Sequence, residues 1–181
     1  MKVVSIVGMS GAGKSEVAGV FEKNGFAKIR FGDVTDMELS KCGLPQIEEN
    51  ESRVRNQLRE QHGMAAYALL NLPRIDSKLE KSGVVVDGLY SWEEYVLMKR
   101  HYGDRLCVVA VYSSPGARRA RLAGRPRRPL TAEQSISRDF DEIEKANKGG
   151  PIAMADLTIV NESSLEELRK KTQEVVDRLL K

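Results

Sequence analysis

The sequence predicts an α/β fold of three layers, in which helices cover both faces of a five-stranded parallel sheet. Two observations predict it. Five short apolar segments alternate with longer polar or amphipathic ones, which is the order of βαβ crossovers. The apolar segments are nearly continuous, as expected for strands that are buried on both faces. The expected strands span residues 2–7, 26–30, 84–87, 106–112 and 157–160.

The composition is that of one globular domain, residues 1–181, which is long enough to bury a substantial core. A net charge of +3 is too small to indicate nucleic-acid binding. No apolar run reaches the length of a membrane span, so no membrane partner is expected. Cys42 and Cys107 do not form a metal-spaced pair. We therefore expect a cytoplasmic protein with reduced cysteines.

The first strand leads into Gly-Met-Ser-Gly-Ala-Gly-Lys-Ser, which matches G-x-x-x-x-G-K-[ST] at every position, and a helix is expected over 16–23. Glycines let such a loop turn its N–H groups inward around phosphate oxygens, and the helix N-terminus adds positive charge. The lysine reaches the β- and γ-phosphates, and the serine hydroxyl can bind Mg²⁺. The expected phosphate-binding residues are Gly8, Met9, Ser10, Gly11, Ala12, Gly13, Lys14 and Ser15, with Lys14 also catalytic and Ser15 also a metal ligand.

An acceptor-side insertion is expected over 33–82, with helices at 35–41, 47–62, 64–70 and 73–81. Asp33 and Asp36 follow the second strand. Either could accept a proton from an acceptor hydroxyl or cap the helix at Thr35. Asp33 is favoured as the catalytic residue because it comes directly after Gly32, at the end of the strand.

The third strand ends on Asp87, and Ser91 with Glu94 has the pattern of a capping box for the next helix. A carboxylate at the end of a buried strand needs a partner, which Mg²⁺ held jointly with Ser15 would supply. The alternative is that Asp87 caps the turn at Gly88. We expect the metal role.

A region expected to form a lid, residues 116–148, begins with six arginines within residues 118–128 and ends in a helix expected over 131–148, which Gly149-Gly150 should break. Such a run also fits a solvated basic face or a nucleic-acid patch, but no aromatic residue lies among the arginines to stack on bases. Arginines that close over a phosphoryl group would stabilise its charge and exclude water. We expect Arg121 and Arg125 to face the nucleotide, and Arg125 and Arg138 to act in catalysis.

The last strand is followed by Asn161 and by a final helix over 165–180. Ligands bind at the carboxyl ends of the strands in sheets of this kind. Gly8, Asp33, Asp87, Tyr112 and Asn161 all stand at such ends, so we expect them to converge, with Asn161 near the nucleotide.

These residues resemble the nucleoside-monophosphate-kinase-like group of P-loop proteins, which includes adenylate kinase and dephospho-CoA kinase. Gly8–Ser15 resembles the nucleotide loop, Gly32-Asp33 the start of the acceptor-binding helix, and Asp87-Gly88 the Asp-Gly after the third strand. Residues 121–125 have the spacing of the two arginines with which adenylate kinases contact adenine and phosphates. The end of the chain, from residue 155, is similar to dephospho-CoA kinase. Uncharacterised adenylate-kinase-related proteins of archaea and bacteria look most similar overall.

The resemblance implies phosphoryl transfer from ATP, with Mg²⁺, to a small nucleotide-like acceptor. Two arginines that clamp the acceptor's phosphate in adenylate kinases are missing, since the corresponding stretches read Val-Thr-Asp-Met (34–37) and Leu-Tyr-Ser (89–91). A hydroxyl acceptor, with Asp33 as base, therefore stands beside a monophosphate acceptor. The alternative from another class is a nucleotide-binding regulatory switch that hydrolyses slowly and signals through lid closure.

Overall fold

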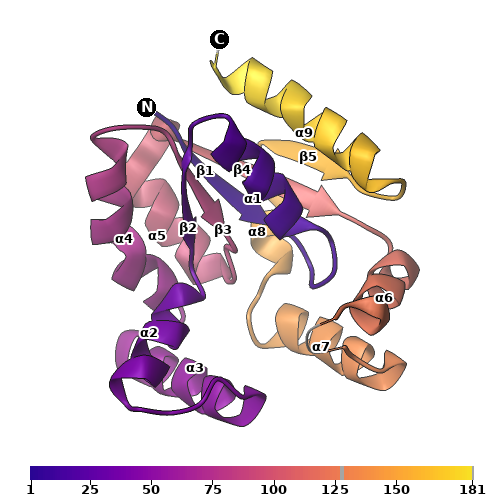
Figure 1. Cartoon of the computed structure of the whole chain (residues 1–181). Helices are drawn as coiled ribbons and strands as arrows, with labels where there is room; N and C mark the ends of the chain where they lie inside the picture. The colour runs from indigo at the N-terminus through magenta and orange to yellow at the C-terminus, as the bar shows by residue number, and fades with distance from the viewer. Residues whose placement is uncertain (127–128, 181) are drawn as a thin grey trace.

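The computed structural model describes residues 1–126 and 129–180, and it confirms the three-layer fold (Figure 1). All five strands are parallel and lie in the order β2-β3-β1-β4-β5. Each strand begins and ends within one residue of its expected position. The strands are β1 (Val3–Val7), β2 (Ala27–Arg30), β3 (Val84–Asp87), β4 (Leu106–Tyr112) and β5 (Leu157–Val160).

Successive side chains of the sheet enter two separate cores. Val84 and Val86 of β3 belong to the core on one face, whereas Val85 between them belongs to the core on the other. This alternation explains why the strands are apolar at consecutive positions instead of every second one.

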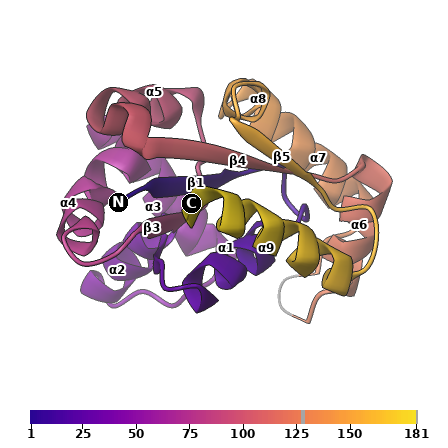
Figure 2. The same ribbon diagram turned by 90° about the horizontal axis from the view of Figure 1, so that it is seen from above.

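Helices cover the two faces unequally (Figure 2). On one face, α1 (Lys14–Lys23) and α9 (Leu165–Leu180) bury Phe21, Leu168 and Val176. On the other face, α4 (Ala66–Leu79) and α5 (Trp92–Tyr102) bury a larger core, and a short 3₁₀ turn, Gly103–Arg105, leads from α5 into β4. Both cores help to fix the position of the central strand β1.

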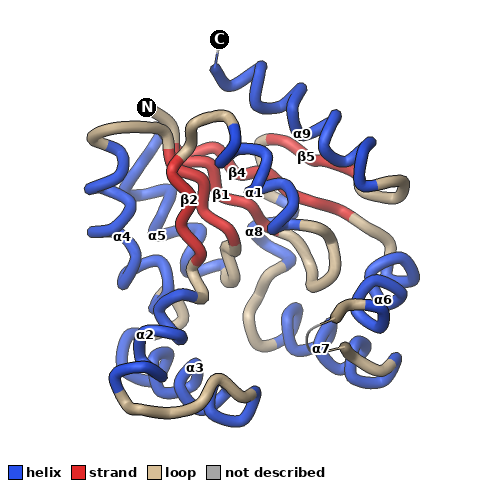
Figure 3. The backbone as a smooth tube through the Cα atoms, viewed as in Figure 1, coloured by secondary structure: helices blue, strands red, loops and turns tan. Residues whose placement is uncertain are grey.

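Two helical excursions leave the sheet at the carboxyl ends of its strands (Figure 3). One carries α2 (Asp33–Lys41) and α3 (Glu48–His62). The other carries α6 (Pro115–Gly124) and α7 (Ala132–Glu144), and it returns through α8 (Gly149–Ala153). The loop between β1 and α1 lies between them.

Two expectations about helices were wrong. The segments 64–70 and 73–81 form the single helix α4, which continues through Pro73. The buried residues Ala66, Tyr67 and Ile75 hold this helix against the core, and such packing outweighs the lost hydrogen bond of one proline. The helix expected over 131–148 ends at Glu144, and the expected break at Gly149-Gly150 is helical as part of α8.

Cys42 is exposed and Cys107 is buried in β4, and both are free thiols. Burial raises the pKa of the Cys107 thiol to about 11, which suits a small core residue and not a nucleophile. Over residues 1–126 and 129–180, none of the helices combines the length and apolar character that a membrane crossing requires.

Candidate phosphate-binding site

The loop between β1 and α1 has a backbone that only glycine can supply at certain positions. Gly8, Gly11 and Gly13 have φ angles of 151°, 80° and 104°. A Cβ at Gly8 would lie 2.4 Å from the carbonyl oxygen of Val111, and one at Gly13 would lie 2.6 Å from Nδ2 of Asn161. The glycines of the motif are therefore needed both for the curl of the loop and for its packing on the sheet.

Lys14 lies folded along this loop. Its Nζ donates hydrogen bonds to the carbonyl oxygens of Gly8 (2.9 Å) and Met9 (3.1 Å). Burial and the nearby charge of Lys148 lower the pKa of Lys14 to about 8, against the opposing charges of Glu142 and Asp87. The ammonium group therefore remains largely protonated at neutral pH, on the carbonyl oxygens of the loop.

Asp87 and Ser15 are the expected metal ligands. Asp87 ends β3, where it pairs in register with Ile6 of β1, and only 5% of it is exposed. Because Ile6 is only two residues before Gly8, this register brings Asp87 near the start of the loop, and its charge opposes the lowering of the Lys14 pKa. Ser15 is exposed at the start of α1. Over residues 1–126 and 129–180, no three His, Cys, Asp or Glu side chains cluster so as to hold a metal alone.

A buried ion pair beside the loop is the main feature that sequence reasoning missed. Glu142 of α7 accepts hydrogen bonds from the backbone N–H (3.0 Å) and the hydroxyl (2.5 Å) of Ser10. Nζ of Lys148 lies 3.0 Å from Glu142 Oε2, and both side chains are almost fully buried. Burial alone would raise the pKa of Glu142, but the charges of Lys148 and Lys14 and the Ser10 hydrogen bond lower it to about 2. The carboxylate is therefore ionised throughout the physiological range.

Arg138, an expected catalytic residue, lies at the same place. Its Nε donates to the Ser10 hydroxyl at 2.9 Å and lies 3.5 Å from Glu142 Oε1. The structure thus brings α7 against the loop of residues 8–15.

Arg121 and Asn161 lie together under the loop. Arg121 donates to the hydroxyl of Ser113 (2.7 Å) and to the carbonyl oxygen of Asn161 (2.9 Å). Asn161 Nδ2 donates in turn to the carbonyl oxygen of Ala12 at 2.8 Å. Both residues therefore support the back of the loop from α6 and from the end of β5.

The remaining arginines of the run differ in their surroundings. Arg118 is buried, with its guanidinium on the carboxylate of Asp139 at 2.6 and 3.0 Å. Arg125 is partly buried at the end of α6. Arg127 and Arg128, which complete the run, lie outside the described residues. The run is thus not a uniform solvated face.

Asp33 is held by arginines from two elements, β2 and α4. Its carboxylate accepts from Arg30 Nε at 2.8 Å and from Arg74 Nη2 at 3.2 Å. Partial burial favours a higher pKa, but the hydrogen bonds from Arg30 and Arg74 outweigh it and lower the pKa. The helix α2 begins at Asp33 without a side-chain cap at Gly32. Tyr112 was expected to converge with Asp33 at the ends of the strands, and it is 50% exposed at the end of β4.

Glu94, which the sequence indicated only as a capping residue, is a fully buried acid. Its backbone N–H donates to Ser91 Oγ, as the capping pattern predicts, and its Oε2 accepts from the Tyr90 N–H at 2.7 Å. Oε1 accepts no hydrogen bond from any residue in the described ranges. Burial raises the pKa of Glu94 to about 8, although the charges of Arg59 and Lys148 oppose this. One oxygen of this buried acid is therefore left without a partner among the described residues, which is typical of functional sites.

The raised pKa of Glu94 predicts a pH-dependent stability. The folded chain binds this proton more tightly than the unfolded chain, whose glutamate has the ordinary pKa of 4.5. Stability is therefore greatest below about pH 4.5 for this group, and it is lost as the pH rises toward 8. Between pH 5 and pH 8, the free energy of unfolding measured in urea should fall by about 2–4 kcal/mol more in wild type than in Glu94→Gln, whose side chain cannot ionise. An equal fall in wild type and in the variant would contradict the raised pKa of Glu94.

Comparisons with known proteins agree with this architecture. Residues 4–141 match the protein family described as an AAA domain. A UPF0200 protein of Thermococcus gammatolerans is 36% identical over 183 residues, covering 99% of this chain and 96% of the relative. A UPF0200 protein of Pyrococcus furiosus is 34% identical over 181 residues, covering 98% and 97%.

Solved structures share the fold at low sequence identity. A gluconokinase from Sinorhizobium meliloti aligns with a TM-score of 0.61 and 16% identity, over 98% of this chain and 93% of its own. A shikimate kinase from Acinetobacter baumannii, solved with shikimate, aligns with a TM-score of 0.61 and 17% identity, over 99% and 93%. The P-loop motif, the parallel sheet and the relatives together show that this chain belongs to the UPF0200 family of P-loop proteins with a kinase-like fold.

Proposed function

We propose that this protein is a Mg·ATP-dependent phosphotransferase that acts on a small nucleotide-like acceptor. The observation that carries the proposal is the glycine-shaped loop at the end of β1, with Lys14 on it and Asp87 beside it. It lies between two helical excursions, of which the one carrying α6 and α7 would bind the donor and the one carrying α2 and α3 the acceptor (Figure 3). The likeness in fold to solved gluconokinase and shikimate kinase structures supports the same reading.

The donor side fits the triphosphate of ATP. The curled loop and the start of α1 would direct N–H groups toward phosphate oxygens, and Lys14 adds a positive charge. The donor set of Ser15 and Asp87, one hydroxyl and one carboxylate, suits Mg²⁺, which usually takes few protein ligands and completes its shell with phosphates and water. Bound there, the ion would neutralise charge on the phosphates. We also assign Arg121, Arg125 and Asn161 to the nucleotide side, where Arg121 and Asn161 would act by supporting the loop from behind.

The acceptor side fits a molecule with both a hydroxyl and an anionic group. Asp33 stays ionised between Arg30 and Arg74, so we assign it the orientation of an acceptor hydroxyl. Arg59 of α3 places its guanidinium 6.0 Å from the Tyr67 ring, and its buried Nε donates to no residue within the described ranges. A phosphate or carboxylate of the acceptor would supply the partner that Arg59 lacks.

A panel of acceptors tests the proposal. ADP formation from Mg·ATP would be followed with nucleoside monophosphates, dephospho-CoA, gluconate and shikimate, and the product would be identified by mass spectrometry. We expect one acceptor class to raise ADP formation at least about 100-fold above the rate without acceptor, because positioning the two reactants supplies much of the barrier reduction. Slow hydrolysis that is indifferent to every acceptor would support a regulatory switch instead.

The variant Asp33→Asn separates the two halves of the site. It keeps the size of the side chain but removes the charge that orients the acceptor, so we expect acceptor-dependent turnover to fall about 100-fold or more. Affinity for ATP should change less than about 2-fold, because Asp33 lies on the acceptor side. Asp36→Asn is the matched control, since Asp36 binds the same Arg30 one helical turn away. Similar turnover losses in both variants would assign Asp33 a structural role.

A further inference from the structure

The carboxylate of Glu142 stands among the groups that would bind a phosphoryl oxygen. It accepts a loop N–H and a hydroxyl from Ser10, and it meets the ammonium of Lys148 and the guanidinium of Arg138. A backbone N–H of a phosphate loop, a lysine and an arginine are the usual donors to phosphate. The contacts of this carboxylate are therefore those of a bound anion.

Lys148 has Glu142 as its close counterion. Its ammonium is buried, and its charge also acts on Lys14, so two positive side chains point at one end of the loop. Nζ of Lys148 also lies 5.6 Å from the centre of the Tyr90 ring, in the segment that follows β3. Without the carboxylate, this pair of ammonium groups would need another anion, because buried like charges repel strongly.

We propose that Ser10, Arg138 and Lys148 form the site of the terminal phosphoryl group of ATP, and that Glu142 occupies this site until the triphosphate binds. This inference rests on the proposed function. The Ser10 N–H is a single donor and two anions side by side repel each other, so entry of the phosphoryl group requires the Glu142 side chain to leave. Lys148 then passes from the carboxylate to the phosphoryl oxygens, beside Lys14 and between donor and acceptor.

The competing reading is a permanent ion pair that holds α7 on the loop. It makes a different prediction, because loss of a permanent ion pair would affect the affinities for nucleotides with two and with three phosphates equally. Displacement, in contrast, concerns only the third phosphate. Comparing ADP with the non-hydrolysable β,γ-imido analogue of ATP therefore separates the two readings.

The test is calorimetric titration of the full chain with both nucleotides in the presence of Mg²⁺. We expect Glu142→Gln to tighten binding of the analogue about 10-fold or more and to change ADP affinity less than about 2-fold. The matched control is Asp141→Asn, which removes an equal charge from the adjacent position, where Asp141 is exposed and bound to Lys145. It should leave both affinities unchanged. Unchanged or weakened binding of the analogue by Glu142→Gln would overturn the inference.

A second variant keeps the test decisive if Glu142→Gln folds poorly. Lys148→Gln should weaken binding of the analogue about 10-fold or more and should weaken binding of ADP much less. Equal weakening of both nucleotides would overturn the role of Lys148. If wild type binds neither nucleotide, the proposed function itself fails. If it binds both while the variants leave their ratio unchanged, only the present inference fails.

The single tryptophan provides a further readout. A Cβ on Gly150 would lie 2.6 Å from the ring of Trp92, so the segment after Lys148 packs directly on this indole. Release of Lys148 from Glu142 should alter that contact. We expect the analogue to change Trp92 fluorescence in wild type and ADP to change it much less. Identical responses to the two nucleotides would contradict displacement.

Discussion

Lys14→Ala should reduce acceptor-dependent turnover about 10²–10³-fold while leaving the fold intact. Removing one group that stabilises charge in a transition state costs about 3–4 kcal/mol in comparable sites. Lys14 makes its two hydrogen bonds to carbonyl oxygens of its own loop, Gly8 and Met9, so its loss should disturb no packing elsewhere. Steady-state kinetics and thermal unfolding of the variant measure the two effects separately.

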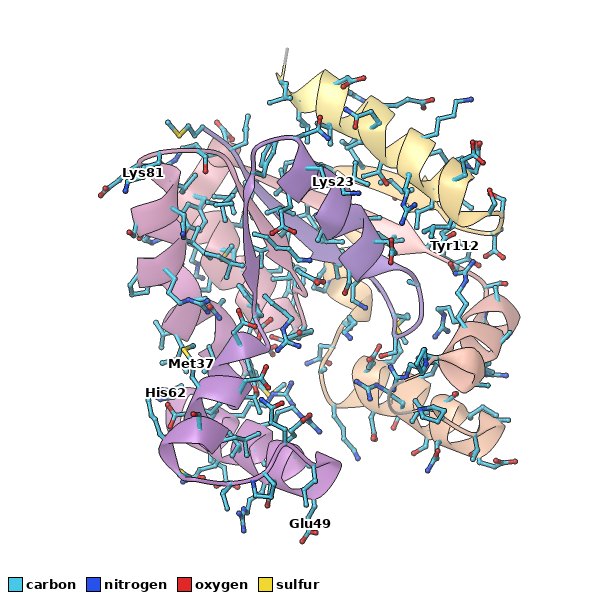
Figure 4. All side chains as sticks on the ribbon, in the orientation of Figure 1. Lys23, Met37, Glu49, His62, Lys81 and Tyr112 are labelled. Atoms are coloured by element: carbon cyan, nitrogen blue, oxygen red, sulfur yellow. The ribbon has the colours of Figure 1, made fainter. Side chains whose placement is uncertain are left out.

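Lys23→Ala is the matched control for this result. Lys23 lies at the opposite end of α1 from the loop and is exposed (Figure 4). The substitution removes the same charge from the same helix, so its turnover should stay within about 2-fold of wild type. Undiminished turnover in Lys14→Ala, or an equal loss in both variants, would contradict the assignment of Lys14.

Arg118→Ala should destabilise the protein by about 3–5 kcal/mol, the usual cost of removing one partner of a buried ion pair. The Arg118 guanidinium makes two hydrogen bonds to Asp139 of α7 and also donates to the carbonyl oxygens of Ser10 and Ser113. Its loss leaves Asp139 without its main partner and removes one of the contacts between the loop and α6. Urea unfolding at neutral pH measures the change.

Arg119→Ala is the comparison for Arg118. The Arg119 guanidinium is 3.9 Å from the same Asp139 carboxylate but is 38% exposed. An exposed pair of this kind contributes about 0–1 kcal/mol, so the variant should be nearly as stable as wild type. Equal losses of stability in the two variants would mean that the buried hydrogen bonds of Arg118 contribute no more than the exposed ion pair of Arg119.

The fold could be predicted from the sequence because its signals are local. The strands are short apolar runs, and the loop of residues 8–15 carries its geometry in its own glycines. The helix α4 could not be predicted as one helix, because a proline such as Pro73 is typical of a helix start. Only the packing of Ala66 and Ile75 against the core, which the sequence does not show, makes the helix continuous.

The contacts of the site were harder to predict because they join distant segments. Glu142 is one of several acids on a strongly charged helix, and nothing in the sequence separates it from Asp141, which faces solvent. Its partner Ser10 lies 132 residues away. Likewise, Asp33 meets Arg74 across 41 residues. A hint existed in the motif itself, because a loop that binds anions attracts a carboxylate when one is within reach.

The most direct test of the central claim is a crystal structure of the chain with Mg²⁺ and the β,γ-imido analogue of ATP in excess. We expect the triphosphate to lie in the loop of residues 8–15, with Lys14 turned from the carbonyl oxygens of Gly8 and Met9 onto the phosphates. Glu142 should then have left the N–H of Ser10. A loop without phosphate, in which Glu142 still holds Ser10, would contradict the account.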